Sequence, residues 1–398
     1  MQTSLFDTPI CRKGSDCYKW DAEPPVKPDE QCNEIIPLWV ADMDFAVAPC
    51  ITDALQKRLE HPVFGYVKVP DRYYDSVIGW FARRHAWTIK REHILYTIGV
   101  VPAVNAILKA LTEKGDKVIM QTPAYNCFFT CIENNGLQLL QNPLVSKDNY
   151  YTIDFSDLEQ KAKDPKAKVL LLCNPHNPTG RVWRPEELRL LADIARRHNL
   201  CVISDEIHCE FTITGIPYTP MANIMSDDTD RLIVCVSPSK AFNIAGLQMA
   251  NIIVASDKLR EKIDKALTEN EISEVNPFGL VANMAAYNSG DGWMDALNQY
   301  LLENYKMLCQ FFEQNLPMLK VNRQEGTYLA WIDCRALGLR SEELENRLLK
   351  QTGVWLNCGT MYGENGEGFM RINMACPKSR LSEGLHKIKQ FVNLNYQK

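Results

Sequence analysis

Short apolar runs alternate with amphipathic stretches through the middle of the chain. Five runs are rich in Val, Ile and Leu and have no alternating polar face. Continuous apolar runs of this length are typical of strands that are buried on both faces of a largely parallel sheet. The runs predict strands at 117–120, 168–173, 200–204, 231–236 and 251–254.

The stretches between these runs have the pattern of helices. One begins at Pro185, a residue favoured at the first helical position, and has Glu186 and Glu187 in its first turn. Another follows Gly99 and has an apolar face through residues 104–111. The repeated order of strand, loop and helix predicts an α/β domain.

The pattern changes after about residue 290. A long helical stretch at 294–314 leads to short strands near 327–332 and 369–372, with helices near 341–351 and 379–391. We therefore expect three parts: an N-terminal arm at 1–44, a large domain at 45–290 and a small α+β domain at 291–398. The arm is expected to pack on the small domain.

Composition narrows the class of protein. The 398 residues are 46% hydrophobic and 23% charged, with a formal net charge of −5, which favours neither nucleic acid nor an anionic membrane as partner. No signal peptide is recognisable in residues 1–19, and no apolar run approaches the ~20 residues of a membrane span. The 14 cysteines form no Cys-x-x-Cys pair and are expected to be free thiols. We expect a cytoplasmic protein.

Four polar motifs follow predicted strands. In an open parallel sheet, ligands bind outside the carboxyl ends of the strands, so these motifs are expected to meet at one edge. The motifs are Thr122-Pro-Ala-Tyr125, Asn174-Pro-His-Asn-Pro-Thr-Gly180, Ser204-Asp-Glu-Ile-His208 and Ser237-Pro-Ser-Lys240.

Lys240 allows two interpretations. Most lysines are solvated, and this one could lie on an ordinary loop. A lysine near the ligand edge of a sheet can instead lose solvation, acquire a lower pKa and form a Schiff base with a carbonyl. The residues alone support both interpretations equally.

Asp205, His208 and Glu210 could form a metal cluster, but no second histidine lies near them in the sequence. Pairing of Asp205 with a protonated pyridine nitrogen fits better, because a carboxylate there keeps the ring an electron sink. We therefore expect no metal site.

Three further features are ambiguous on their own. The turn at Gly99 opens a helix whose N-terminus suits a phosphate, although many such turns bind nothing. Tyr125 could be a core aromatic residue or stack on a ring. Arg371 lies in a short apolar strand, where it could face solvent or bind a carboxylate. No serine-hydrolase, zinc-protease, P-loop or dinucleotide motif is present.

The motifs, taken together and in order, resemble the fold type I pyridoxal-5′-phosphate (PLP) enzymes over essentially the whole chain. The resemblance is strongest to the MalY/PatB cystathionine β-lyase branch, which is aminotransferase-like and includes bacterial C–S lyases. It rests on the four motifs above and on Pro37-Leu-Trp-Val-Ala-Asp-Met-Asp-Phe45, Gly65-Tyr66, Gly99-Val-Val-Pro-Ala-Val104, Ala241-Phe-Asn-Ile-Ala-Gly246 and Arg371-Ile-Asn373. It implies a mostly parallel seven-stranded sheet in the large domain, beside a smaller α+β domain.

The resemblance also implies a PLP site. Lys240 would carry the cofactor and move protons, Asp205 would pair with the ring nitrogen, and Tyr125 would stack on the ring. Asn174 would bond the ring hydroxyl, with a less certain contact from His208. The phosphate would be held by Val100, Val101, Ser237 and Ser239.

Substrate and partner contacts are implied in the same way. Arg371 would bind the carboxylate of an amino-acid substrate, with Asn174 and the backbone of Val40 and Ala41 beside it. The unit would be a homodimer in which Tyr66 reaches the phosphate of the other subunit.

Two positions depart from the pattern of related enzymes. Gln248 stands where aminotransferases usually have an arginine for the phosphate, which weakens an assignment as aspartate aminotransferase. Asn126 stands where some C–S lyases have a second tyrosine, so substrate preference could differ.

The reaction implied is β-elimination from cystathionine or cysteine-like amino acids, giving pyruvate, ammonia and a thiol. The same residues would serve an aminotransferase, which is the alternative. A regulatory or binding protein on a PLP-enzyme fold is disfavoured, because the full set of catalytic residues is retained.

Overall fold

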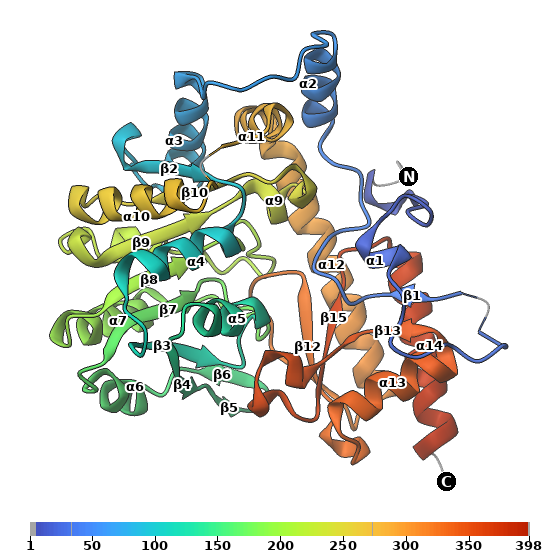
Figure 1. The fold of residues 1–398 in the computed structure, drawn as a ribbon. Coiled ribbons are helices and arrows are strands. Elements are labelled where there is room, and N and C mark those ends of the chain that lie inside the picture. Colours follow the sequence, from blue (N-terminus) through green and yellow to red (C-terminus); the bar gives the residue numbers. More distant parts are fainter. Residues whose placement is uncertain (1–4, 33, 273, 397–398) are drawn as a thin grey trace.

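The computed structural model describes residues 5–32, 34–272 and 274–396. A seven-stranded sheet crosses the left half of the molecule in Figure 1, in the order β2-β10-β9-β8-β7-β3-β4. Five neighbours, β9, β8, β7, β3 and β4, are parallel, and β10 is antiparallel to both of its neighbours. The strands are β2 (Ile94–Thr97), β3 (Lys117–Thr122), β4 (Gln138–Pro143), β7 (Ala167–Cys173), β8 (Cys201–Asp205), β9 (Leu232–Val236) and β10 (Ala250–Ile253).

Successive side chains of the central strands enter two different hydrophobic clusters. In β7, Val169 and Leu171 belong to one cluster, whereas Leu170 and Leu172 belong to the other. Both faces are therefore buried, as the continuous apolar runs predicted. One cluster includes residues of α4 (Val100–Leu111), α5 (Asn126–Asn134) and α10 (Asp257–Glu269), and the other includes residues of α3 (Asp71–His85), α6 (Phe155–Ala162), α7 (Pro185–Arg197) and α11 (Pro277–Ser289).

The predicted α/β architecture with a seven-stranded, mostly parallel sheet is confirmed. All five expected strands are present, with ends that differ by one or two residues. The expectations did not include the outermost strands β2 and β4. Five of the six residues of β4 are partly buried or exposed, and the strand has no continuous apolar signal.

A second sheet occupies the right side of Figure 1. Its four antiparallel strands have the order β11-β12-β15-β14, and three long helices accompany it. The elements are β11 (Lys320–Val321), β12 (Leu329–Asp333), β14 (Asn357–Cys358), β15 (Phe369–Asn373), α12 (Asp291–Asn315), α13 (Ser341–Thr352) and α14 (Lys378–Tyr396). Residues of this sheet and of the three helices enter the larger hydrophobic cluster.

The N-terminal segment lies beside this second sheet in Figure 1. It contains α1 (Tyr18–Asp21) and β1 (Ile36–Pro37), and β1 pairs in parallel with β13 (Val354–Trp355). The chain then reaches α2 (Pro49–Leu59), which packs on α11. The expected domain limits at residues 44 and 290 stay a prediction.

A buried acid joins the loop before β12 to the loop after β7. The carboxylate of Glu325 accepts hydrogen bonds from Arg181 Nε at 3.0 Å, Arg184 Nη2 at 2.6 Å and the amide of Val182 at 3.2 Å. The amide of Gly326 also donates to the carbonyl of Gly180. These bonds fix the 174–180 loop against the second sheet.

No helix in the described part of the chain has the length and apolar character needed to cross a bilayer. All 14 cysteines are free.

Candidate active site

A cavity of about 190 Å³ lies where β8 and β9 end and α4 begins. The sheet brings these segments together because the carboxyl ends of parallel strands meet at one edge. The residues that line the cavity include Ala41, Gly99, Val100, Val101, Tyr125, Asn177, Asp205, His208, Ser239 and Lys240.

Lys240 lies in α9 (Pro238–Ala241), directly after β9. The hydroxyl of Ser237 caps this short helix by accepting a hydrogen bond from the amide of Ser239 at 3.0 Å. Lys240 Nζ donates to the carbonyl of Ala41 at 2.7 Å. Burial, together with the charge of Arg371, lowers the pKa of Lys240, which favours a neutral and nucleophilic amine.

Asp205 is the last residue of β8 and is almost completely buried. Its Oδ1 accepts a hydrogen bond from the amide of Ile207 at 3.0 Å. Burial raises the pKa of Asp205 to about 7, although that hydrogen bond and the charge of Lys240 oppose the shift. A cationic ligand atom opposite this carboxyl would stabilise its charged form.

Asn174 and His208 each have a buried polar atom without a hydrogen-bond partner in the structure, Oδ1 of Asn174 and Nδ1 of His208. Burial lowers the pKa of His208 to about 3, so its ring is neutral. The amide nitrogen of Asn174 donates to the carbonyl of Thr219 at 3.0 Å. Unpaired buried atoms are costly, and a polar ligand in the adjacent cavity would relieve that cost.

The N-terminus of α4 lines another part of the cavity through Val100 and Val101. The first amides of a helix have no partner within it and form the positive end of the helix dipole, so they suit an anion. Ser239 also lines the cavity, whereas the hydroxyl of Ser237 donates to the carbonyl of Met249 at 2.6 Å. Gln248 is exposed and does not line the cavity.

Arg371 is buried in β15, where a charge is costly unless it is paired or hydrogen-bonded. Its Nη2 donates to the carbonyl of Trp39 at 2.7 Å and its Nη1 to Asn177 Oδ1 at 3.3 Å. Its Nε is buried without a partner. The guanidinium thus retains a free donor, and Asn177 connects it to the cavity.

Tyr125 lines the cavity, and burial raises the pKa of its hydroxyl, which is therefore protonated. Its ring makes an edge contact with Phe128. Val40 and Ala41 lie in the loop before α2, and only Ala41 lines the cavity.

The possible metal ligands divide between two places. Asp205 and His208 line the cavity, but Glu210 accepts hydrogen bonds from Trp80 Nε1 at 2.7 Å and Arg84 Nε at 3.2 Å, and lies 2.7 Å from His85 Nε2. A metal cation bound at Glu210 would be repelled by the positive charge of Arg84. The close spacing of the three residues in the sequence therefore does not produce a shared site.

Tyr66 is the one expected site residue that lies well apart from this cavity in the described chain. It is fully exposed and borders a separate surface hollow. Two residues with clear contacts at the site were not assigned a role from the sequence, Asn177 and Tyr328. Asn177 could have been found from the sequence, because it lies in the same motif as Asn174. Tyr328 could not, because only the fold brings its hydroxyl to the Ala41 carbonyl, at 2.9 Å.

Comparisons with known proteins identify the family of this chain. The family model of aminotransferase class I and II matches residues 33–388. Cystathionine beta-lyase PatB of Bacillus subtilis (strain 168) is 41% identical over 96% of this chain and 98% of its own.

Two solved structures are also similar. Cystalysin from Treponema denticola, which contains PLP, has a TM-score of 0.94 and 37% identity over 98% of each chain. The PLP-bound C–S lyase from Staphylococcus hominis has a TM-score of 0.89 and 34% identity over 97% of each chain. The chain therefore belongs to the aminotransferase class I and II family of fold type I PLP enzymes, in the branch that contains PatB.

The raised pKa of Asp205 predicts how stability depends on pH in the cofactor-free protein. The pKa rises from 3.8 to about 7 on folding, so the folded protein holds this proton more tightly than the unfolded chain. Stability from this group is therefore fully present below the ordinary pKa and is lost as the pH rises towards about 7. Replacing Asp205 with Asn should raise the free energy of unfolding of the cofactor-free protein at about pH 8 by up to ~4 kcal/mol.

The measurement is thermal unfolding of cofactor-free wild type and Asp205→Asn at about pH 8 and about pH 5.5. The difference in melting temperature should narrow at the lower pH. A difference that is the same at both pH values would contradict a buried acid that titrates in this range.

Proposed function

We propose that this protein is a PLP-dependent carbon–sulfur β-lyase of amino-acid metabolism, which releases pyruvate, ammonia and a thiol. The observation that carries the proposal is the presence of a partly buried lysine, Lys240, and a buried acid, Asp205, in the lining of one cavity. The printed name of PatB, cystathionine beta-lyase, supports a sulfur-containing amino acid as substrate.

The residues of the cavity fit PLP. Asp205 offers its carboxyl to the ring nitrogen, Lys240 offers its amine to the aldehyde, and Tyr125 offers its ring for stacking. The unpaired atoms of Asn174 and His208 suit the ring hydroxyl.

The phosphate end also fits, at the start of α4. Its donors are the amides of Val100 and Val101 and the hydroxyl of Ser239, while Ser237 supports the turn that carries Ser239. Gln248 adds no positive charge to the phosphate site. The helix amides and the Ser239 hydroxyl would therefore supply most of the phosphate contacts that come from this subunit.

Arg371 is proposed to bind the α-carboxylate of the substrate. Its free Nε and its planar guanidinium suit a carboxylate, and Asn177 already orients one of its terminal nitrogens. Asn174 and the backbone at Val40 and Ala41 complete this side of the substrate site.

The bound cofactor supplies an electron sink for the negative charge that develops on the substrate. Lys240 then removes the proton from Cα, for which its lowered pKa suits it. Arg371 orients the substrate so that this proton faces Lys240. With the cofactor bound, Asp205 would pair with the ring nitrogen and favour its protonated form, and the thiolate would leave from Cβ.

An assay of pyruvate separates the lyase from the alternative aminotransferase. With cystathionine and no added 2-oxo acid, the protein should release pyruvate, ammonia and a thiol over many turnovers, because elimination needs no second substrate. Turnover that depends on a 2-oxo acid, and that yields a new amino acid instead of ammonia, would establish transamination.

The role of Arg371 predicts a selective defect. Arg371→Ala should lower kcat/KM for amino-acid substrates. The loss of transition-state stabilisation should be ~2–4 kcal/mol, because a charge-assisted bidentate contact is lost. The absorbance of bound PLP should be retained. Steady-state kinetics and absorbance spectra of both proteins check this, and an unchanged kcat/KM would exclude the role.

We propose that the active unit is a homodimer with Tyr66 near the phosphate of the other subunit. Leu59, Val63, Phe64 and Tyr66 are large apolar side chains exposed on neighbouring segments, and such patches are typical of interaction surfaces. The basic residues Arg58 and Arg72 border the surface hollow that Tyr66 also borders, and their positive charge suits the phosphate of the other subunit. A two-fold axis would make the exchange reciprocal.

Complementation between two inactive variants tests the shared site. Mixed dimers of Tyr66→Ala and Lys240→Ala place both changes in one site and leave the other site intact, so activity should return to at most about half per dimer. The composition of the dimers is checked by mass spectrometry with differently tagged subunits. No recovery in verified mixed dimers, with Tyr66→Ala alone severely impaired, would place Tyr66 in its own subunit's site.

We also propose that the enzyme works in the cytoplasm. Fourteen free cysteines, several of them exposed or partly exposed, fit a reducing compartment better than an oxidising one.

A further inference from the structure

The loop at residues 39–43 presents its carbonyls to both proposed substrate-handling residues. The carbonyl of Trp39 accepts hydrogen bonds from Arg371 Nη2 at 2.7 Å and Asn357 Nδ2 at 3.1 Å. The carbonyl of Ala41 accepts from Lys240 Nζ at 2.7 Å and the hydroxyl of Tyr328 at 2.9 Å. The position of this loop therefore sets where the amine and the guanidinium lie.

Two side chains from opposite directions hold the same loop. Asn373 Nδ2 donates to the carbonyls of Val40 and Asp42, both at 2.6 Å. Asn243, three residues after Lys240, accepts from the amide of Met43 at 3.0 Å and donates to its carbonyl at 2.8 Å. These contacts tie the loop to β15 and to the turn after α9.

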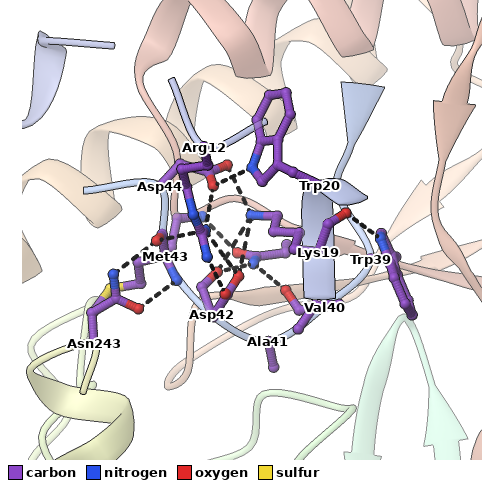
Figure 2. A network of polar contacts seen from close by, with 12 residues as sticks. Arg12, Lys19, Trp20, Trp39, Val40, Ala41, Asp42, Met43, Asp44 and Asn243 are labelled. Carbon is purple, nitrogen blue, oxygen red and sulfur yellow. Dashed lines mark hydrogen bonds and ion pairs between the residues drawn. The ribbon is translucent and has the colours of Figure 1, made fainter. Parts of the chain in front are cut away.

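The remaining support is a cluster of charges from the N-terminal segment, drawn in Figure 2. Lys19 Nζ lies 2.8 Å from Asp44 Oδ2 and has no exposed side-chain surface. Arg12 bridges the two acids, with Nη1 at 2.7 Å from Asp44 and Nη2 at 2.5 Å from Asp42. Trp20 Nε1 also donates to Asp44, at 2.9 Å.

The cluster contacts the loop backbone as well as its acids. Arg12 Nη1 donates to the carbonyl of Met43 at 3.1 Å, and Lys19 Nζ to that of Asp42 at 3.4 Å. Trp39 Nε1 donates in return to the carbonyl of Lys19 at 3.1 Å. Both ends of the loop are thus fixed to residues 12–20, far from the cavity in sequence and outside its lining.

We propose that Lys19 and Arg12 are positioning residues for the reaction, which act by holding the Trp39 and Ala41 carbonyls against Arg371 and Lys240. The proposal rests on the roles given above to Arg371 and Lys240. It assigns to residues 12–20 a part in substrate binding, although none of these residues lines the cavity.

A purely structural role would make a different prediction. Breaking a buried ion pair by removing one partner destabilises a protein whether or not the pair affects a site. A displaced loop would in addition release Arg371 and Lys240, and small displacements of catalytic groups can cost ~100-fold in rate. The test therefore needs a readout of loop position besides stability and activity.

The experiment compares the Lys19→Met holoenzyme with wild type and with Lys13→Met, an exposed lysine of the same segment. Hydrogen–deuterium exchange is followed at the amides of Met43 and Asp44, which donate to Asn243 Oδ1 and to the carbonyl of Ala375. Lys19→Met should speed exchange there by about tenfold or more. It should also lower kcat/KM by about 10- to 100-fold, mainly through a higher KM, and Lys13→Met should match wild type.

One result would overturn the proposal: Lys19→Met lowers the melting temperature but leaves the exchange of the Met43 and Asp44 amides and the KM at their wild-type values. The cluster would then only stabilise the fold. Should Lys19→Met fail to fold, Arg12→Gln replaces it, because Arg12 is partly exposed; unchanged exchange and KM in that variant would equally overturn the proposal. Hydrogen–deuterium exchange reports the position of the loop whether or not the proposed reaction is correct. A failure of the role of Arg371 would appear separately, as unchanged kcat/KM in Arg371→Ala.

Discussion

The hydrogen bond from Lys240 Nζ to the Ala41 carbonyl joins residues 199 positions apart and is the contact on which the site depends. It connects the end of β9 to the N-terminal loop, and that loop also holds Arg371 through the carbonyl of Trp39. The proposed cofactor lysine and the proposed carboxylate-binding arginine therefore both contact one short segment of backbone.

The site is unfavourable for the protein alone, and this indicates that a ligand belongs there. Burial lowers the pKa of Lys240 and raises that of Asp205, so both charges are opposed by their surroundings. Buried polar atoms of Asn174, His208 and Arg371 have no partner. On the proposed roles, PLP and an amino-acid carboxylate would together supply the groups that these residues lack.

Much of the fold could be predicted from the sequence because central parallel strands are continuous apolar runs. The polar motifs after those runs also predicted part of the cavity lining, since strand ends such as Asp205 and the turn at Lys240 must meet at one edge. Contacts formed by distant segments could not be predicted in this way. Lys19 and Arg12 appear in a polar N-terminal stretch, and only the fold brings them to Asp42 and Asp44. Tyr66 stays a prediction from family resemblance, because its partner would lie on another chain.

The account's central claim is that Lys240 carries the cofactor, and chemical trapping tests it most directly. The purified holoenzyme is treated with borohydride, digested, and mapped by mass spectrometry for the lysine that bears the reduced cofactor. The account predicts the label on Lys240, in the peptide that follows β9. A label on another lysine, with Lys240 unmodified, would contradict it.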